Sequence, residues 1–75
     1  MNTFNIGRYD EEHPETFVIY AESRDQVTAK HIAYMYNREY ASLGQPTRLE
    51  VLSDIELATR GSRHRYLGED PRYIY

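Results

Sequence analysis

The stretch that decides the fold is TFVIYAESRDQ, Thr16 to Gln26. Residues 16–21 are β-branched, aromatic or small and apolar, a composition typical of a strand. Ser23 is followed three residues later by Gln26, and this spacing predicts a capping box. In that motif the serine oxygen accepts a backbone amide of the first turn, and the glutamine reaches back to the amide of the capping residue. A strand that runs directly into a helix is therefore expected here.

A long amphipathic helix is expected over residues 24–42. Gly44 and Pro46 end it, because glycine adopts a left-handed conformation and proline cannot continue a helix. Apolar residues at spacings of three and four form one stripe for packing on a sheet. The stripe consists of Ala29, Ile32, Ala33, Tyr36, Tyr40 and Leu43. Outside it lie Val27, His31, Tyr34 and Met35, which are tolerated surface residues, the edge of a wider stripe or a second contact face.

Two further strands flank this unit. In residues 3–9, Phe4 and Ile6 alternate with polar or small residues, and in residues 47–53, Leu49 and Val51 alternate in the same way. This period of two is typical of strands with one buried face. The sequence therefore predicts an α+β fold with β-β-α-β order. We expect a three-stranded antiparallel sheet, order 2-1-3, packed on one long helix with a right-handed crossover.

The chain is expected to form one small domain followed by a tail. We place the β-β-α-β domain at residues 1–59, where Ser53 or Asp54 can cap a short helix that Gly61 ends. Residues 60–75 lack a sustained period, and terminal segments of this kind are often mobile. They are therefore expected to be a flexible C-terminal tail.

Charge is distributed unevenly between these two parts. The net charge is -3, but residues 1–59 hold five basic and ten acidic side chains, whereas residues 60–75 hold four arginines and two acids. Arginine and tyrosine are the residues that most often anchor interfaces. We predict that the tail becomes ordered on an acidic partner surface, with a solvated tail or a nucleic-acid contact as alternatives. The predicted contact residues are Arg60, Arg63, His64, Arg65, Tyr66, Arg72 and Tyr73.

The composition also argues against several kinds of chemistry. Cysteine is absent, and the three histidines are scattered, so neither thiolate nor histidine metal sites are expected. No nucleophile motif or glycine-rich phosphate loop is present. We therefore expect a binding protein with no catalytic site, no cofactor and no metal. The mildly acidic charge disfavours a dedicated nucleic-acid binder, and no apolar run is long enough to predict a membrane span.

Short motifs resemble those of the small phage-encoded inhibitors of bacterial RNA polymerase. The run Ile19-Tyr20-Ala21-Glu22-Ser23 enters the helix, and Leu49-Glu50-Val51 lies in the last strand. In that family a three-stranded antiparallel sheet packs on one helix, a strand ending Tyr-Ala-Glu-Ser/Thr leads into the helix, and Phe-Glu-Val begins the last strand. The resemblance covers residues 3–55. The family's polymerase-contacting arginines after Phe-Glu-Val are replaced here by Ser53 and Ile55.

This resemblance implies a function and a partner. The chain is also similar in size and build to a phage regulator that binds the polymerase β′ subunit, displaces σ and acts as an antiterminator. We therefore expect a monomeric transcription regulator in the cytoplasm of the bacterial host, which binds RNA polymerase and inhibits initiation. The Ala-Glu-Ser motif also resembles some anti-CRISPRs, so an anti-defence protein is one alternative. A small nucleic-acid-binding accessory protein is another.

Overall fold

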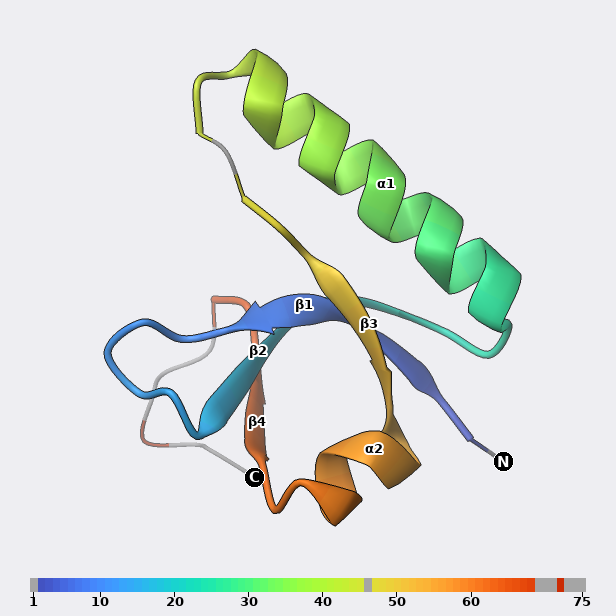
Figure 1. Cartoon of the computed structure of the whole chain (residues 1–75), viewed down its shortest axis with the longest axis vertical. Helices are drawn as coiled ribbons and strands as arrows, with labels where there is room; N and C mark the ends of the chain where they lie inside the picture. The colour runs from blue at the N-terminus through green and yellow to red at the C-terminus, as the bar shows by residue number, and fades with distance from the viewer. Residues whose placement is uncertain (1, 46, 69–71, 73–75) are drawn as a thin grey trace.

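The computed structural model describes residues 2–45, 47–68 and 72, and it has the expected α+β architecture with one main helix (Figure 1). The elements in chain order are β1 (Phe4–Tyr9), β2 (Thr16–Ser23), α1 (Gln26–Ser42), β3 (Glu50–Ser53), α2 (Asp54–Thr59) and β4 (Arg63–Tyr66). α1 runs diagonally past the sheet, and its C-terminal end projects beyond it (Figure 1). The α+β class is therefore confirmed.

The sheet has four strands in the order β3-β1-β2-β4. β1 lies between β2 and β3 and is antiparallel to both, as predicted, while β4 is parallel to β2. The prediction of a three-stranded, purely antiparallel sheet is therefore wrong. The missing strand has the sequence Arg63-His64-Arg65-Tyr66, which contains no alternation of apolar and polar residues that could have marked it.

The fourth strand also changes the predicted boundary after residue 59. The amide of Arg63 donates to the carbonyl oxygen of Glu15, and the amide of Leu67 donates to that of Ile19, both at 2.9 Å. A flexible tail that begins at residue 60 does not describe this segment, since residues 63–66 belong to the sheet. In the rest of the predicted tail, residues 60–62, 67, 68 and 72 are described, and the others lie outside the described residues.

α1 begins two residues later than expected. Asp25, and not Ser23, is its capping residue, because the Asp25 carboxylate accepts from the amide of Thr28 at 2.8 Å. Ser23, two positions before the cap, instead accepts from the amide of Asp25 through its hydroxyl at 3.2 Å. The predicted end is confirmed, since Gly44 has a φ of 73°.

The predicted stripe of α1 is correct except at its C-terminal end. Ala29 and Ala33 are buried. Half-buried Ile32, Tyr36 and Tyr40 continue the stripe. Leu43, however, is 64% exposed. It is the capping residue at the C-terminal end of α1, and this end of the helix projects past the sheet (Figure 1).

Both faces of the sheet carry a hydrophobic core. The core beneath α1 is built from Ile6, Ala29, Ala33 and Leu49, and the core on the opposite face, beneath α2, from Phe17, Ile19, Leu52 and Leu57. The sheet is thus a layer between a long helix and a short one (Figure 1). The apolar residues found on both sides of β2 in the sequence are explained by this arrangement.

A bulge in β2 sets which side chains face α1. The pairing of β1 with β2 shifts between Ile6 and Gly7, so that Tyr20 is the extra residue of β2. As a result Tyr20 and Ala21, although consecutive, both pack against the α1-side core. Gly7 is required at this position, because a Cβ there would lie 1.9 Å from the carbonyl oxygen of Val18.

β3 is shorter than the predicted strand of residues 47–53 because a side chain replaces strand pairing at its start. The amide of Leu49 donates to Oδ1 of Asn37 at 2.7 Å, and Nδ2 of Asn37 donates back to the Leu49 carbonyl at 3.2 Å. At the other end of β3, Ser53 caps α2 through a complete capping box with Glu56. The predicted short helix is therefore confirmed.

Candidate functional site

Two arginines lie in one cross-strand row of the sheet. Arg8 of β1 pairs with Val18 of β2, and Val18 pairs with Arg65 of β4. Directly paired residues of neighbouring strands project from the same face. Two strand spacings separate the arginines, which places their Cα atoms about 10 Å apart. Val18, between them, is buried, so the two cations flank an apolar floor.

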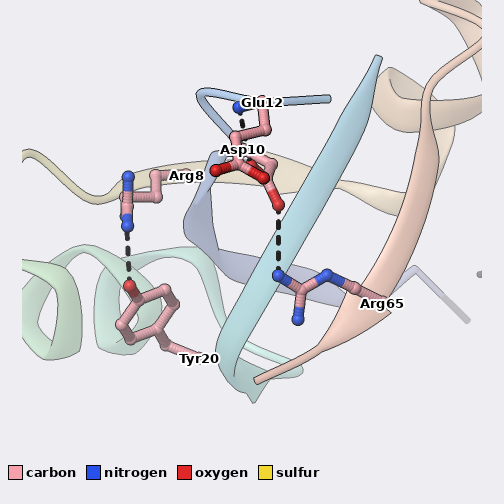
Figure 2. Close-up of polar contacts among 5 residues, drawn as sticks. All are labelled: Arg8, Asp10, Glu12, Tyr20 and Arg65. Carbon is pink, nitrogen blue, oxygen red and sulfur yellow. Dashed lines mark hydrogen bonds and ion pairs between the residues drawn. The ribbon is translucent and has the colours of Figure 1, made fainter. Parts of the chain in front are cut away.

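Arg65 is held in place by Asp10 (Figure 2). Its Nη2 lies 3.2 Å from Oδ2 of Asp10, and both side chains are less than one fifth exposed. The other carboxylate oxygen of Asp10 accepts from the amide of Glu12 at 2.9 Å. The Glu12 amide, and next the Arg65 guanidinium, lower the pKa of Asp10 below its usual value. The carboxylate therefore stays ionised and orients Arg65.

Arg8 is oriented by a tyrosine. Its Nε donates to the hydroxyl of Tyr20 at 3.1 Å (Figure 2), and this bond raises the pKa of Arg8 above its usual value. Among the described residues, the terminal nitrogens of Arg8 have no hydrogen-bond partner. A guanidinium fixed through Nε still presents these terminal N–H groups, which are the donors that bind a carboxylate or phosphate side by side.

Three tyrosines form a cluster next to Arg8. The ring of Tyr20 lies edge-on to Tyr36 and Tyr40, at centroid distances of 6.3 and 6.1 Å. Tyr36 and Tyr40, one turn apart on α1, are stacked at 6.2 Å. All three are half-buried, so each ring has an apolar side packed in the domain and an edge toward solvent.

These groups make one surface on the α1 side of the sheet, which we call the arginine–tyrosine surface. It consists of Arg8, Tyr20, Tyr36, Tyr40, Arg63 and Arg65. Arg63 belongs to it because it pairs with Thr16, two residues before Val18 on β2. Its side chain is exposed and makes no hydrogen bond or ion pair with the other described residues. Asp10 and Glu11 are nearby acids whose charges act on Arg8. Three arginines against these two carboxylates leave a small positive balance, which suits an anionic partner.

The alternation of β4 divides the contact residues predicted from the sequence between two faces. Arg63 and Arg65 pair with Thr16 and Val18 and lie on the α1 side. His64 and Tyr66 pair with Phe17 and Ile19, whose side chains belong to the core beneath α2. The hydroxyl of Tyr66 donates to Glu22. The predicted set is therefore not one surface.

Of the remaining predicted contact residues, Arg60 lies at the end of α2 and is therefore apart from the arginine–tyrosine surface. Arg60 is the C-terminal capping residue of α2 and forms an ion pair with Glu50 at 3.7 Å, with both side chains about half exposed. Arg72 is exposed. Tyr73 lies outside the described residues, so its predicted role is not addressed by the fold.

A small hollow under α2 contains the residue types of a hydrolase triad. Its volume is about 310 Å³, and Asp54, Ser62 and His64 are among its lining residues. Oγ of Ser62, however, shares a hydrogen bond of 2.8 Å with the hydroxyl of Tyr9, and Asp54 accepts from Asn5 at 2.8 Å. These bonds tie Ser62 and Asp54 to β1, which is not the serine–histidine–carboxylate chain that nucleophilic catalysis uses.

Metal and membrane sites were also considered over the described part of the chain. There, no three His, Cys, Asp or Glu side chains come together in a group that could hold a metal ion. Within the same residues, neither helix combines the length and the apolar character needed to cross a bilayer.

Comparison of the chain with protein families, with curated proteins and with solved structures gives no significant match. The features of this chain that bear on its function are therefore the geometry of the surface and the short motifs at the end of β2 and in β3.

Sequence reasoning missed Arg8, Tyr20 and Asp10 as parts of the site. A signal for Arg8 was present, because it shares the strand parity of Phe4 and Ile6 and therefore projects from the face expected to be buried. A cation on that face needs a partner or a ligand. The contribution of Tyr20 could not have been found in this way, since it depends on the bulge.

Proposed function

We propose that this chain is a phage-type regulator that binds bacterial RNA polymerase in the host cytoplasm and inhibits transcription initiation. Two features support the proposal. The β1-β2-α1-β3 core has the element order of the small polymerase inhibitors that the sequence resembles. Tyr20-Ala21-Glu22-Ser23 also lies at the end of the strand that leads to α1, as it does in those proteins.

The observation that carries the proposal is the arginine–tyrosine surface. Arg8 and Arg65 are already held in position by Tyr20 and Asp10, so less side-chain entropy is lost when a partner binds. Tyrosine and arginine supply most of the energy in many interfaces. Cations ordered in this way fit an acidic surface on a folded protein. The partner surface that we propose lies in the β′ subunit region of the polymerase.

The mechanism would be occlusion or displacement. A non-covalent ligand inhibits initiation if it covers a surface that σ or promoter DNA must contact, because the two binding events then exclude each other. The uneven charge of this chain is compatible with that role, since the acidic residues outnumber the basic ones over residues 1–59. Such a body repels nucleic acid, while the arginines attract an acidic protein.

A binding and transcription assay with purified polymerase tests the proposal. The Arg8→Ala/Arg63→Ala variant removes two cations from the surface, and the Arg24→Ala/Arg48→Ala variant removes two exposed cations elsewhere. The first should bind polymerase at least tenfold more weakly, about 1.4 kcal/mol, and should lose inhibition in proportion. The second should remain within about twofold of the wild type, since exposed charges away from an interface contribute little.

Three results would argue against this function. Wild-type protein that fails to bind core polymerase or holoenzyme at micromolar concentrations excludes the polymerase as target. Recovery of Cas subunits or other defence proteins from infected-cell lysate would favour the anti-defence alternative. A gel shift with DNA or RNA that weakens steeply as salt rises would favour the nucleic-acid-binding alternative.

A further inference from the structure

The α1 side of the sheet is only partly covered by a helix. Among the described residues, the core beneath α1 takes its strand side chains from β1, β2 and β3 and from Leu49, and none from β4. A helix with its side chains is about 10–12 Å wide, and a sheet of four strands, spaced about 4.8 Å apart, is wider than that. Toward β4, this face therefore has no helix over it in the described part of the chain.

Charged side chains cover the floor of this open part. Val18 is buried, yet it belongs to neither hydrophobic core. Arg8 and Arg65 flank it on opposite sides of β2 (Figure 2). The ion pair between Asp10 and Arg65 joins the end of β1 to β4 across β2. The chain thus covers this floor with polar side chains, whereas a helix covers the rest of the face.

A hollow lies along the flank of α1 that faces the open part. Its volume is about 660 Å³, and its described lining residues, Met35 and Tyr36 among them, all belong to α1. Asn37, which bonds to Leu49 next to β3, marks the opposite flank, because Met35 is about 200° of helical rotation away from it. Tyr36 also contacts the ring of Tyr20 on β2. The flank of α1 and the face of the strands therefore form the two walls of one groove.

We propose that this groove binds an amphipathic, acidic α-helix of the partner protein, which lies on the sheet beside α1. The apolar side of that helix fills the hollow against Ile32 and Met35. Its acidic side chains meet the terminal N–H groups of Arg8 and the guanidinium of Arg63. Packed helices lie about 8–10 Å apart, so the partner helix lies above the floor between Arg8 and β4. The inference rests on the proposed function for the role of this surface and adds the structural element that the surface binds.

A helix fits this position better than an extended segment does. An element on the face of a sheet cannot join the ladder of strands, so its backbone N–H and C=O groups need partners within the element itself. A helix provides these partners, and an extended segment does not. The hollow follows α1 from His31 to Ser42, which is about 17 Å at 1.5 Å per residue and matches about three turns of a second helix.

Charge selects an acidic partner over a second copy of this chain. Arg38 and Glu39 both line the hollow and balance each other, so the arginines of the strands give the groove its positive sign. α1, the long helix of the chain, carries Lys30 and Arg38 against Glu39 and is therefore basic. α2 is acidic, but it has only six residues and its Leu57 is buried in a core. Neither helix in the described part of a second copy meets the requirement.

Fluorescence anisotropy with synthetic helical peptides tests the inference on the full chain. The probe is a labelled peptide of about four turns, with leucines along one side of the helix and glutamates along the other. One control has the same composition with its leucines distributed around the helix, and a second has glutamine in place of glutamate. The acidic amphipathic peptide should bind at micromolar concentration, as expected for a small interface. Each control should bind at least tenfold more weakly.

Matched variants of the protein locate the two walls of the groove. Met35→Glu should weaken binding of the acidic peptide at least tenfold, because it places a carboxylate where the apolar side packs. Tyr34→Glu is the control, since Tyr34 is 59% exposed against 47% for Met35 and does not line the hollow. It should stay within about twofold of the wild type. Arg8→Ala/Arg63→Ala should bind the glutamate and glutamine peptides equally, a change that partial unfolding would not produce.

Several results would overturn the inference. Equal binding of the glutamate and glutamine peptides by the wild type would remove its electrostatic part, and equal effects of Met35→Glu and Tyr34→Glu would remove the hollow. A short DNA duplex that binds more tightly than the acidic peptide would identify nucleic acid as the occupant. A mass that rises with concentration from 8.9 kDa in the wild type and not in Met35→Glu would identify a second copy.

These assays contain no polymerase, so the two proposals fail separately. A protein that binds the acidic peptide but not the polymerase would overturn the proposed function and leave this inference standing. A protein that binds the polymerase but not the acidic peptide would do the reverse.

Discussion

The two faces of the sheet are covered in different ways. On one face, the 17-residue α1 packs through small residues, Ala29 and Ala33, which allow the helix to approach closely. On the other face, the six-residue α2 contributes one buried side chain, Leu57, and the strands supply the bulk through Phe17 and Ile19. The long helix thus packs on the sheet through small side chains, whereas the short helix covers large side chains of the strands.

This difference explains where the proposed binding surface lies. Beneath α2, large side chains fill the space between the strands and the helix. On the other face, α1 leaves part of the sheet uncovered. Half-buried Tyr20, Tyr36 and Tyr40 lie at the edge of the area that the helix covers. Rings and cations at such a rim are available to a partner, whereas a closed core is not. The α1 side of the sheet therefore carries the proposed binding surface.

The largest expected effect is on the α2 face. Phe17 is fully buried and contacts the ring of Tyr9 at 5.2 Å, so Phe17→Ala should cost about 3–5 kcal/mol of unfolding free energy. Tyr36→Ala on the α1 face should cost about 1–2 kcal/mol, because Tyr36 is only half-buried. Urea denaturation followed by circular dichroism measures both. Equal losses would mean that the two faces do not differ as described.

The next effect concerns α2 itself. Leu57→Ala should cost about 2–4 kcal/mol, because Leu57 is the buried contact between α2 and the sheet. Ile55, two residues earlier on the same helix, is 65% exposed, and Ile55→Ala should change stability by less than about 0.5 kcal/mol. Thermal unfolding of the matched pair is the measurement. If Leu57→Ala were as harmless as its control, α2 would not contribute to a core.

A smaller loss of stability is expected from a substitution of Gly7, which lies opposite the bulge of β2. Gly7→Ala would place a methyl group against the carbonyl oxygen of Val18, and it should cost about 1–3 kcal/mol as β1 and β2 adjust. Because the bulge positions Tyr20, the variant should also bind the partner more weakly than its stability loss alone explains. Chemical shifts of Tyr20 and Arg8 in NMR spectra would report this movement. Unchanged stability would show that the strands are further apart than described.

The smallest expected effect is a dependence on pH. The lowered pKa of Asp10 means that the unfolded chain takes up a proton before the folded one does. Asp10 therefore stabilises the fold above its usual pKa of about 3.9, and this contribution is lost as pH falls through the lower, folded value. Asp10→Asn should flatten the decline of the urea midpoint between pH 5 and pH 3.

Arg65→Gln sharpens this measurement. The Glu12 amide is the larger cause of the lowered pKa, and the Arg65 guanidinium is the next. The Arg65→Gln variant should therefore retain part of the acid dependence that Asp10→Asn removes. If Arg65→Gln removed all of it, the ion pair and not the backbone amide would dominate at Asp10.

Much of the fold follows from local patterns. Period-two alternation placed β1 and β3, strand-forming composition placed β2, the three-and-four spacing placed α1, and Gly44 marked its end. The short helix after β3 followed from Ser53, whose capping box requires only residues within one turn. Such features depend on neighbours in sequence and are therefore visible in it. The start of α1 was missed because Ser23 and Asp25 are both good caps.

The candidate site was recognised only in part. Arg63 and Arg65 were expected to contact a partner, but so were His64 and Tyr66, which the strand turns to the other face. The side chains of residues 63–66 do not reveal that this segment pairs with β2. The pairing is made by backbone N–H and C=O groups, and it depends on which backbone groups of β2 are not already paired with β1. Arg8 and Tyr20 entered the site only once β4 and the bulge were known.

The sequence by itself determined every described element of this protein except β4, because a helix or a strand with one buried face depends on the spacing of residues along the chain. It also determined the uneven charge and the aromatic composition, in which eight tyrosines stand beside two phenylalanines and no tryptophan. Only the tertiary structure decided that Arg8, Val18 and Arg65 form one row across three strands. That row depends on strand order and register. Val18 and Arg65, which pair in it, are 47 positions apart in the sequence, and no local pattern encodes such a pairing.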